Sequence, residues 1–110
     1  MRDNGVYLSY IRESIELIEA YTGGEAETFS SNLRTQDAVL RRMETLADAA
    51  AHLSDDLKTD HPEIDWRQVT AFRNVLAHGY TEVRLDQVWQ AIAQDLPALN
   101  AVVDEELSRC

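Results

Sequence analysis

The residues with the clearest chemical potential lie together in the segment 72–80. Arg73, Asn74, His78 and Tyr80 stand there among mostly apolar neighbours. An arginine supplies a permanent cation with planar donors for a phosphate, and a histidine is the most common general acid or base. If the attacking group is the 2′-hydroxyl of an RNA, neither a nucleophilic side chain nor a metal is required. The segment therefore predicts chemistry compatible with metal-free RNA cleavage.

The spacing within this segment determines which groups can act together. Asn74 and His78 are four residues apart and share one face of a helix, so the amide can hydrogen-bond the imidazole and orient it. Arg73 and His78 are five residues apart, about 140° around the helix and about 7.5 Å along it. They converge only if the helix end unwinds at Gly79, or if a second copy of the segment lies across a twofold axis.

The predicted end of the helix favours acid–base chemistry at His78. Gly79 is expected to take the left-handed conformation that stops the helix directly after His78. The negative end of the helix dipole then favours a protonated imidazole. A simpler interpretation remains open, in which Arg73 forms an ordinary salt bridge, His78 caps backbone carbonyls and Tyr80 is a partly buried aromatic residue that closes a loop.

Other candidate ligands and bases are weaker. His52 is expected at the surface of a helix, and His61 precedes a proline in a loop. Three aspartates lie near His61 without a recognised metal-ligand spacing, so a solvated acidic loop is expected and no metal or other cofactor is predicted. These aspartates are Asp55, Asp56 and Asp60.

The elements that must position these residues are all helical. Apolar residues recur at spacings of three and four along most of the chain, and no strand-like alternation occurs. Short connections favour an antiparallel, all-α bundle of four to five helices. The predicted elements are a helix over 5–22, a short helical turn within 25–31, a helix over 35–53, a loop over 54–63, a helix over 66–78 and a helical stretch over 85–107 with a kink or break at Pro97.

The start of the helix over 66–78 carries the sharpest local signal. Asp65 can cap it and Gln68 stands three residues on to complete a capping box, so the helix is expected to begin at Trp66. Thr35 is the expected N-cap of the preceding long helix. The buried face of the helix over 66–78 is expected to contain Val69, Phe72, Val75 and Leu76.

Length and composition predict one domain over residues 1–110. A chain of 110 residues with 45% hydrophobic residues can fill a core without metal or disulfide support. It has one cysteine, Cys110, and neither a secretory signal nor a run long enough to cross a membrane. These features predict a soluble protein of the cytoplasm with no membrane partner.

The net charge of -10 argues against binding nucleic acid through a broad electrostatic surface. Nine of the ten basic residues are nevertheless arginine, the side chain suited to placed phosphate contacts. Arg34, Arg41 and Arg42 are the nearest approach to a basic patch, and the sequence leaves open whether they face Arg73. A small cationic cleft within an acidic shell is the arrangement that fits both facts.

Four segments in order resemble the HepT-type toxins of the HEPN family. Arg73, His78 and Tyr80 match the family's R-x4-H-x-Y motif, with Asn74 directly after the arginine. The other three segments are residues 34–39 (RTQDAV), 61–67 (HPEIDWR) and 95–97 (DLP), which are similar to family stretches at the same relative positions. The resemblance covers almost the whole chain.

This resemblance implies a helical homodimer in which two R-x4-H motifs face a shared cleft. It implies a metal-independent endoribonuclease, the toxin of a toxin–antitoxin system, with RNA as the substrate. Arg73 and His78 are then the catalytic residues, Asn74 supports them, and Tyr80 is the residue to which a nucleotidyltransferase antitoxin transfers AMP.

Two alternatives belong to other functional classes. The chain could be a non-catalytic HEPN module that binds a nucleotide, or that serves as the helical partner of a minimal nucleotidyltransferase, with Arg73 holding phosphate. It could also be a plain dimerising bundle in which Arg73 and His78 have no chemical role.

Overall fold

Apolar side chains that recur along each long helix meet in one core. The computed structural model describes residues 4–109, and every long helical stretch contributes to the buried cluster. Burying such a side chain contributes roughly 1.5–3 kcal/mol, so the periodic stripe is what drives the helices together. The most deeply buried large side chains are Phe29, Leu8, Ile11, Ile18, Val39, Val88 and Val103.

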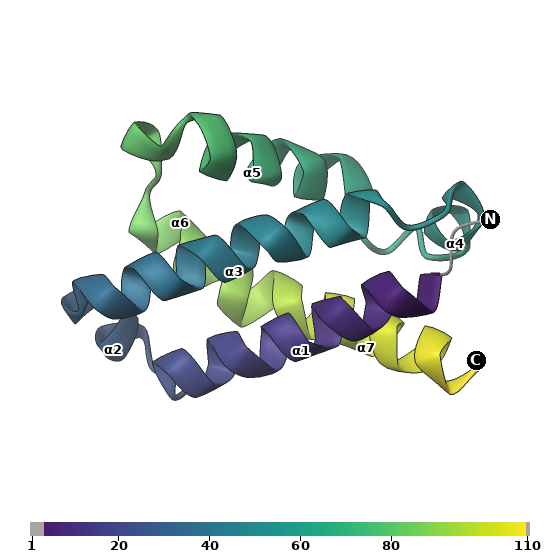
Figure 1. The fold of residues 1–110 in the computed structure, drawn as a ribbon, viewed down its shortest axis with the longest axis horizontal. Helices are drawn as coiled ribbons and strands as arrows, with labels where there is room; N and C mark the ends of the chain where they lie inside the picture. The colour runs from purple at the N-terminus through teal and green to yellow at the C-terminus, as the bar shows by residue number, and fades with distance from the viewer. Residues whose placement is uncertain (1–3, 110) are drawn as a thin grey trace.

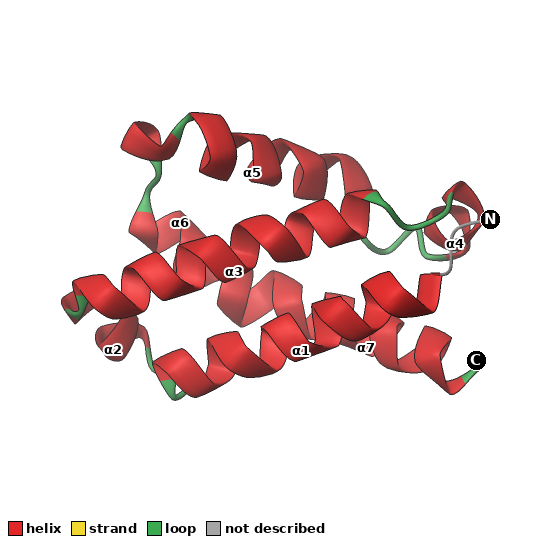
Figure 2. Ribbon diagram, in the orientation of Figure 1, coloured by secondary structure: helices red, strands yellow, loops and turns green. Residues whose placement is uncertain are grey.

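The described residues form helices and connecting loops, with no strand among residues 4–109 (Figure 2). The all-α prediction is therefore confirmed. Four long helical stretches build the bundle, namely α1, α3, α5 and the run from α6 to α7. The elements are α1 (Asn4–Thr22), α2 (Ala26–Ser31), α3 (Leu33–Ala51), α4 (Asp55–Asp60), α5 (Trp66–His78), a 3-10 turn η1 (Tyr80–Glu82), α6 (Leu85–Gln90), a π-helical segment η2 (Ala91–Asp95) and α7 (Leu96–Ser108).

Successive long helices run in alternating directions, as the short connections predicted. Helix α3 lies between α1 and α5 and packs on both, while α7 packs on α1 (Figure 1). Helix α5 lies at the outer edge of the bundle, with α3 as its main support. Among residues 4–109, no helix combines the length and the apolar character needed to cross a bilayer.

Two helix starts differ from the prediction because asparagine and serine caps were overlooked. Helix α3 begins at Leu33, since the Asn32 side chain accepts a hydrogen bond of 3.0 Å from the N–H of Thr35, which is thus inside the helix. The predicted loop over 54–63 contains α4, because Ser54 caps it at the N–H of Leu57 and Leu57 is buried.

The predicted start of α5 is confirmed, whereas its end and its buried face differ. Asp65 accepts a hydrogen bond of 3.1 Å from the N–H of Gln68, and the helix begins at Trp66. Gly79 follows the helix with φ −109°, so the left-handed prediction is wrong. A side chain at Gly79 would place Cβ 3.3 Å from the Val75 carbonyl oxygen, a tight contact that favours glycine. Val75 is 43% exposed, so its predicted burial is also wrong.

The predicted interruption near Pro97 is present as a π-helical segment. Helix α6 passes into η2, and α7 then begins at Leu96 with Pro97 in its first turn. Proline has no N–H to donate to the carbonyl four residues earlier, so the regular ladder fails just upstream of it.

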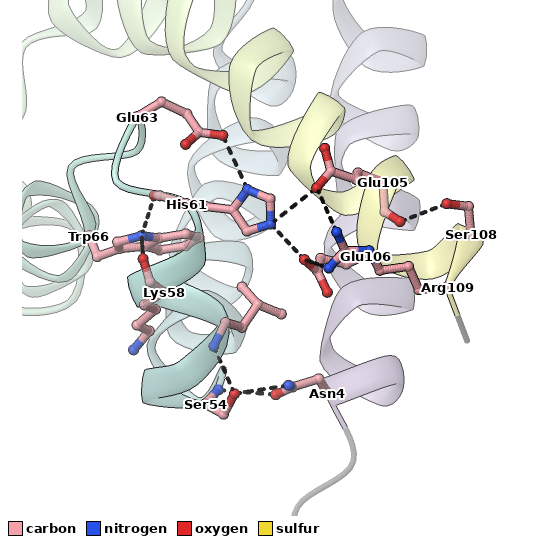
Figure 3. Close-up of polar contacts among 11 residues, drawn as sticks. Asn4, Ser54, Lys58, His61, Glu63, Trp66, Glu105, Glu106, Ser108 and Arg109 are labelled. Carbon is pink, nitrogen blue, oxygen red and sulfur yellow. Dashed lines mark hydrogen bonds and ion pairs between the residues drawn. The ribbon is translucent and has the colours of Figure 1, made fainter.

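His61 joins the start of α5 to the C-terminal part of α7 (Figure 3). It lies in the connection between α4 and α5 and is only 4% exposed. Its Nε2 atom lies 2.6 Å from a carboxylate oxygen of Glu106, and its Nδ1 atom lies 3.1 Å from one of Glu63. The Trp66 indole N–H donates to the His61 carbonyl oxygen at 3.0 Å. The segment directly before α5 is therefore held in place by both the backbone and the side chain of His61.

These contacts favour the protonated imidazole. The hydrogen bond to Glu106, with support from Glu63 and Glu105, raises the pKa of His61 above its ordinary 6.5, although burial of the ring acts in the opposite direction. A hydrogen bond from its own backbone N–H and the contact with His61 lower the pKa of Glu63 below 4.5. The group is therefore most stabilising when His61 is charged and Glu63 is ionised.

We expect the stability of the protein to fall as the pH rises above about 6.5. A raised folded-state pKa means that the His61 contribution is fully present below the unfolded pKa of 6.5 and is lost as the pH passes through the folded value. Urea unfolding measured from about pH 6 to about pH 9 should show this decline, and His61→Gln should flatten it. His52→Gln, which changes an exposed histidine directly after α3, is the control and should keep the wild-type slope. Equal slopes in wild type and His61→Gln would contradict the assignment.

Candidate active site

Helices α3 and α5 enclose a cleft that contains both Arg73 and His78. We call it the α3–α5 cleft; its volume is about 430 Å³. Helix α5 remains regular through His78, so no unwinding brings the two side chains together. The cleft is lined by Arg41, Glu44, Thr45 and Asp48 from α3 and by Arg73, Asn74, Ala77 and His78 from α5.

The guanidinium of Arg73 is held at two of its nitrogens. Nη1 donates to Oδ1 of Asp48 at 2.9 Å, and Nη2 donates to Oδ1 of Asn74 at 3.1 Å. The Asn74 oxygen thus contacts Arg73, the residue before it, instead of the imidazole of His78. With 31% of its side chain exposed, Arg73 still has donors that reach the cleft.

His78 occupies the last turn of α5 with its side chain open to the cleft. It is exposed, and among residues 4–109 its ring forms no hydrogen bond or ion pair. The imidazole can therefore contact a ligand that enters the cleft. The cleft thus contains a histidine without a hydrogen-bonding partner among the described residues and an arginine that is held in place. Together these two side chains can contact a phosphodiester from two sides.

Tyr80 follows directly in η1, whose backbone turns away from the end of α5. Its side chain lies outside the described part of the structure. The predicted modification at Tyr80 is therefore supported here only by its place two residues after His78.

The three arginines of the possible basic patch lie in different surroundings. Arg41 lines the α3–α5 cleft and pairs with Glu44 at 3.6 Å. Arg42 turns to α1, where its guanidinium lies over the ring of Tyr10, 5.9 Å from the ring centroid. Arg34 is exposed near the start of α3. Only Arg41 of these three therefore adds positive charge to the cleft.

Sequence reasoning missed the two carboxylates of the cleft, Glu44 and Asp48. A signal was present, because polar residues at 41, 44 and 48 follow a spacing of three and four. That polar stripe lies opposite the buried residues of α3, and α5 packs beside it. The sequence alone does not show which helix lies beside this stripe.

The other predictions for histidine and acidic residues are mixed. His52 is exposed, as expected, and its ring stacks on Tyr7 with centroids 5.2 Å apart. His61 is buried, which the sequence did not indicate. The acidic residues at 55, 56 and 60 are exposed, as predicted for a solvated segment.

One further group has the atom types of a metal site, formed by His61, Glu105 and Glu106. Their ligand atoms lie within 4.8 Å of one another. A metal needs the neutral imidazole, however, while the surrounding carboxylates raise the pKa of His61 and favour the cation. The geometry is that of a buried histidine hydrogen-bonded to Glu63 and Glu106.

Comparisons with known proteins show which family this chain resembles in sequence. The family model described as "Ribonuclease HepT-like" matches residues 11–106. A protein of Thermococcus cleftensis named "Probable ribonuclease HepT" is 37% identical over 89% of this chain and 90% of its own length. A Methanocaldococcus jannaschii protein whose name combines a gamma-glutamylcyclotransferase and a "putative RNase" is 35% identical over 89% of this chain, but over only 45% of its own length. No solved structure gives a significant match.

Proposed function

The chain belongs to the HepT-like ribonuclease family, and from this premise we propose that it is a metal-independent endoribonuclease acting in the α3–α5 cleft. The observation that carries the proposal is that Arg73 and His78 line one cleft. Family membership supports the reaction class, and the presence of both side chains in this cleft supports their role as the reacting groups.

The chemistry needs only the substrate and these side chains. The 2′-oxygen of a ribose attacks the adjacent phosphorus, its proton passes to His78, and the bond from phosphorus to the 5′-oxygen breaks. A second, protonated histidine gives a proton to that 5′-oxygen. Arg73 stabilises the charge that develops on the equatorial phosphate oxygens. The products are a 2′,3′-cyclic phosphate and a free 5′-hydroxyl.

A homodimer supplies the second histidine. One chain brings a single His78, whereas proton removal and proton donation in one step use two groups. Helix α5 packs mainly on α3, and its exposed side carries Val75 next to the cleft residues. An isologous contact through this side of α5 would place two copies of Arg73 and His78 in one shared cleft.

The biological role that fits this activity is that of a toxin. An endoribonuclease that is not regulated would cleave the RNA of the cell that makes it, so control by a partner is expected. We propose that a nucleotidyltransferase antitoxin transfers AMP to the hydroxyl of Tyr80, with loss of pyrophosphate from ATP. The added nucleotide would bring a phosphate and bulk to the edge of the cleft, where it competes with RNA.

We expect His78→Ala to lower RNA cleavage by at least about 100-fold, because general acid–base catalysis contributes that much or more. The assay is cleavage of a single-stranded RNA in the presence of a chelator, with growth inhibition in a bacterial host as a second readout. Arg34→Ala, which changes an exposed basic residue outside the cleft, should keep full activity. Undiminished cleavage by His78→Ala would remove its catalytic role, and a wild-type protein that binds RNA without cutting it would favour a non-catalytic module.

We expect Val75→Glu to shift the protein from dimer to monomer and to reduce cleavage with it, since a charge would be buried in the proposed interface. Sedimentation analysis over a range of concentrations measures the shift. Val6→Glu on α1 is the control, because Val6 is also exposed, at 64%. A monomeric wild-type protein that is fully active would refute the shared cleft.

We expect a mass increase of one or more AMP units when the protein is produced together with its nucleotidyltransferase, and we expect Tyr80→Phe to abolish it. Intact-protein mass spectrometry measures both. Tyr21→Phe is the matched control, because Tyr21 is an exposed tyrosine on α1. Modification that persists in Tyr80→Phe would assign the site elsewhere.

A further inference from the structure

We infer that Asp48 is a positioning residue for Arg73, fixing the guanidinium so that its remaining donors face the phosphate of the RNA. This inference rests on the proposed ribonuclease function, which it extends to a residue on the neighbouring helix. It concerns the direction of the arginine and assigns Asp48 no contact with the substrate.

The contact joins two helices at the point where the chemistry is proposed. Asp48 stands on α3 and Arg73 on α5, and the 2.9 Å distance between Oδ1 and Nη1 is that of a charge-assisted hydrogen bond. Both residues line the α3–α5 cleft. The long arginine side chain is thereby restrained by a residue outside its own helix.

The Arg73 guanidinium has enough N–H donors to be held by the protein and still bind the substrate. A guanidinium has five N–H donors in one plane, and Asp48 and Asn74 occupy one donor on each terminal nitrogen. The two held nitrogens, together with the covalent bond from Nε to the side chain, define the plane of the guanidinium, and donors remain for two oxygens of a phosphate. Without Asp48, the guanidinium keeps only the contact with Asn74, its direct neighbour in sequence.

The solvent exposure of Asp48 and Arg73 distinguishes a positioning role for their ion pair from a role in folding. The side chains of Asp48 and Arg73 are 51% and 31% exposed, and ion pairs this open to water contribute little to folding. Loss of the Asp48 carboxylate should therefore leave the bundle intact while it releases the arginine.

The cleft contains its own control. Glu44 lies one turn before Asp48 on α3 and lines the same cleft, but it pairs with Arg41 at 3.6 Å. Removing Glu44 deletes the same negative charge from the cleft and leaves the contacts of Arg73 unchanged. A comparison of the two sites distinguishes positioning from a general effect of charge.

The test compares Asp48→Ala, Asp48→Asn and Glu44→Ala in steady-state cleavage of one defined RNA oligonucleotide. We expect Asp48→Ala to lower kcat by about 10- to 100-fold, as small misplacements of a catalytic group do. Asp48→Asn keeps an acceptor oxygen for Nη1, and we expect its kcat to stay within about fivefold of wild type, since a neutral hydrogen bond is weaker than a charged one. Glu44→Ala also removes a negative charge from the cleft, and we expect its kcat to fall less than that of Asp48→Ala, because Glu44 pairs with Arg41 and does not contact Arg73.

A second measurement does not depend on activity. The Nε–Hε signal of Arg73 in nitrogen-15 NMR spectra should be sharp in wild type and in Asp48→Asn, and broadened in Asp48→Ala. Equal cleavage by wild type and Asp48→Ala, an equal loss in Glu44→Ala, or an Asn variant as impaired as the Ala variant would overturn the positioning role. If the wild type cleaves no RNA but the NMR contrast holds, the ribonuclease proposal fails while the restraint on Arg73 stands.

Discussion

The packing of α5 on α3 is the interaction on which the site depends. Leu76 of α5 belongs to the hydrophobic core and is only 7% exposed. Phe72, also of α5, is half-buried against this core. This apolar contact sets the distance between the two helices, and it leaves the cleft beside them. The hydrogen bond between Arg73 and Asp48 then forms across a distance between α3 and α5 that the apolar residues set.

The segment before α5 links this helix to the rest of the bundle. Asp65 caps the helix, Trp66 donates to the His61 carbonyl oxygen, and the His61 side chain contacts Glu106 of α7. A shift in register of one residue would turn Arg73 by about 100° and remove it from the cleft. The residues just before α5 therefore help to set which of its side chains line the α3–α5 cleft.

The sequence predicted the helices themselves better than the contacts between them. The all-α fold and the start of α5 at Trp66 follow from spacing and capping, which depend on neighbours in sequence, whereas the spacing of Arg73 and His78 did not predict that one regular helix would bring both to a single cleft. The burial of Val75 was predicted from α5 alone, but only the position of α3 decides which side of α5 is covered. Asp48 and the buried His61 were missed for the same reason, because their partners stand 25 and 45 residues away.

The π-helical segment η2 is what lets α6 and α7 share one buried face. Val88 and Leu96 are eight residues apart, so in a regular α-helix they would point about 80° away from each other. The wider turns of η2 advance by a smaller angle per residue and offset most of that difference. Val88 and Leu96 are accordingly 1% and 6% exposed. The phase of α7, and with it the buried face that α7 presents to α1, is thus set by five residues that are not themselves buried.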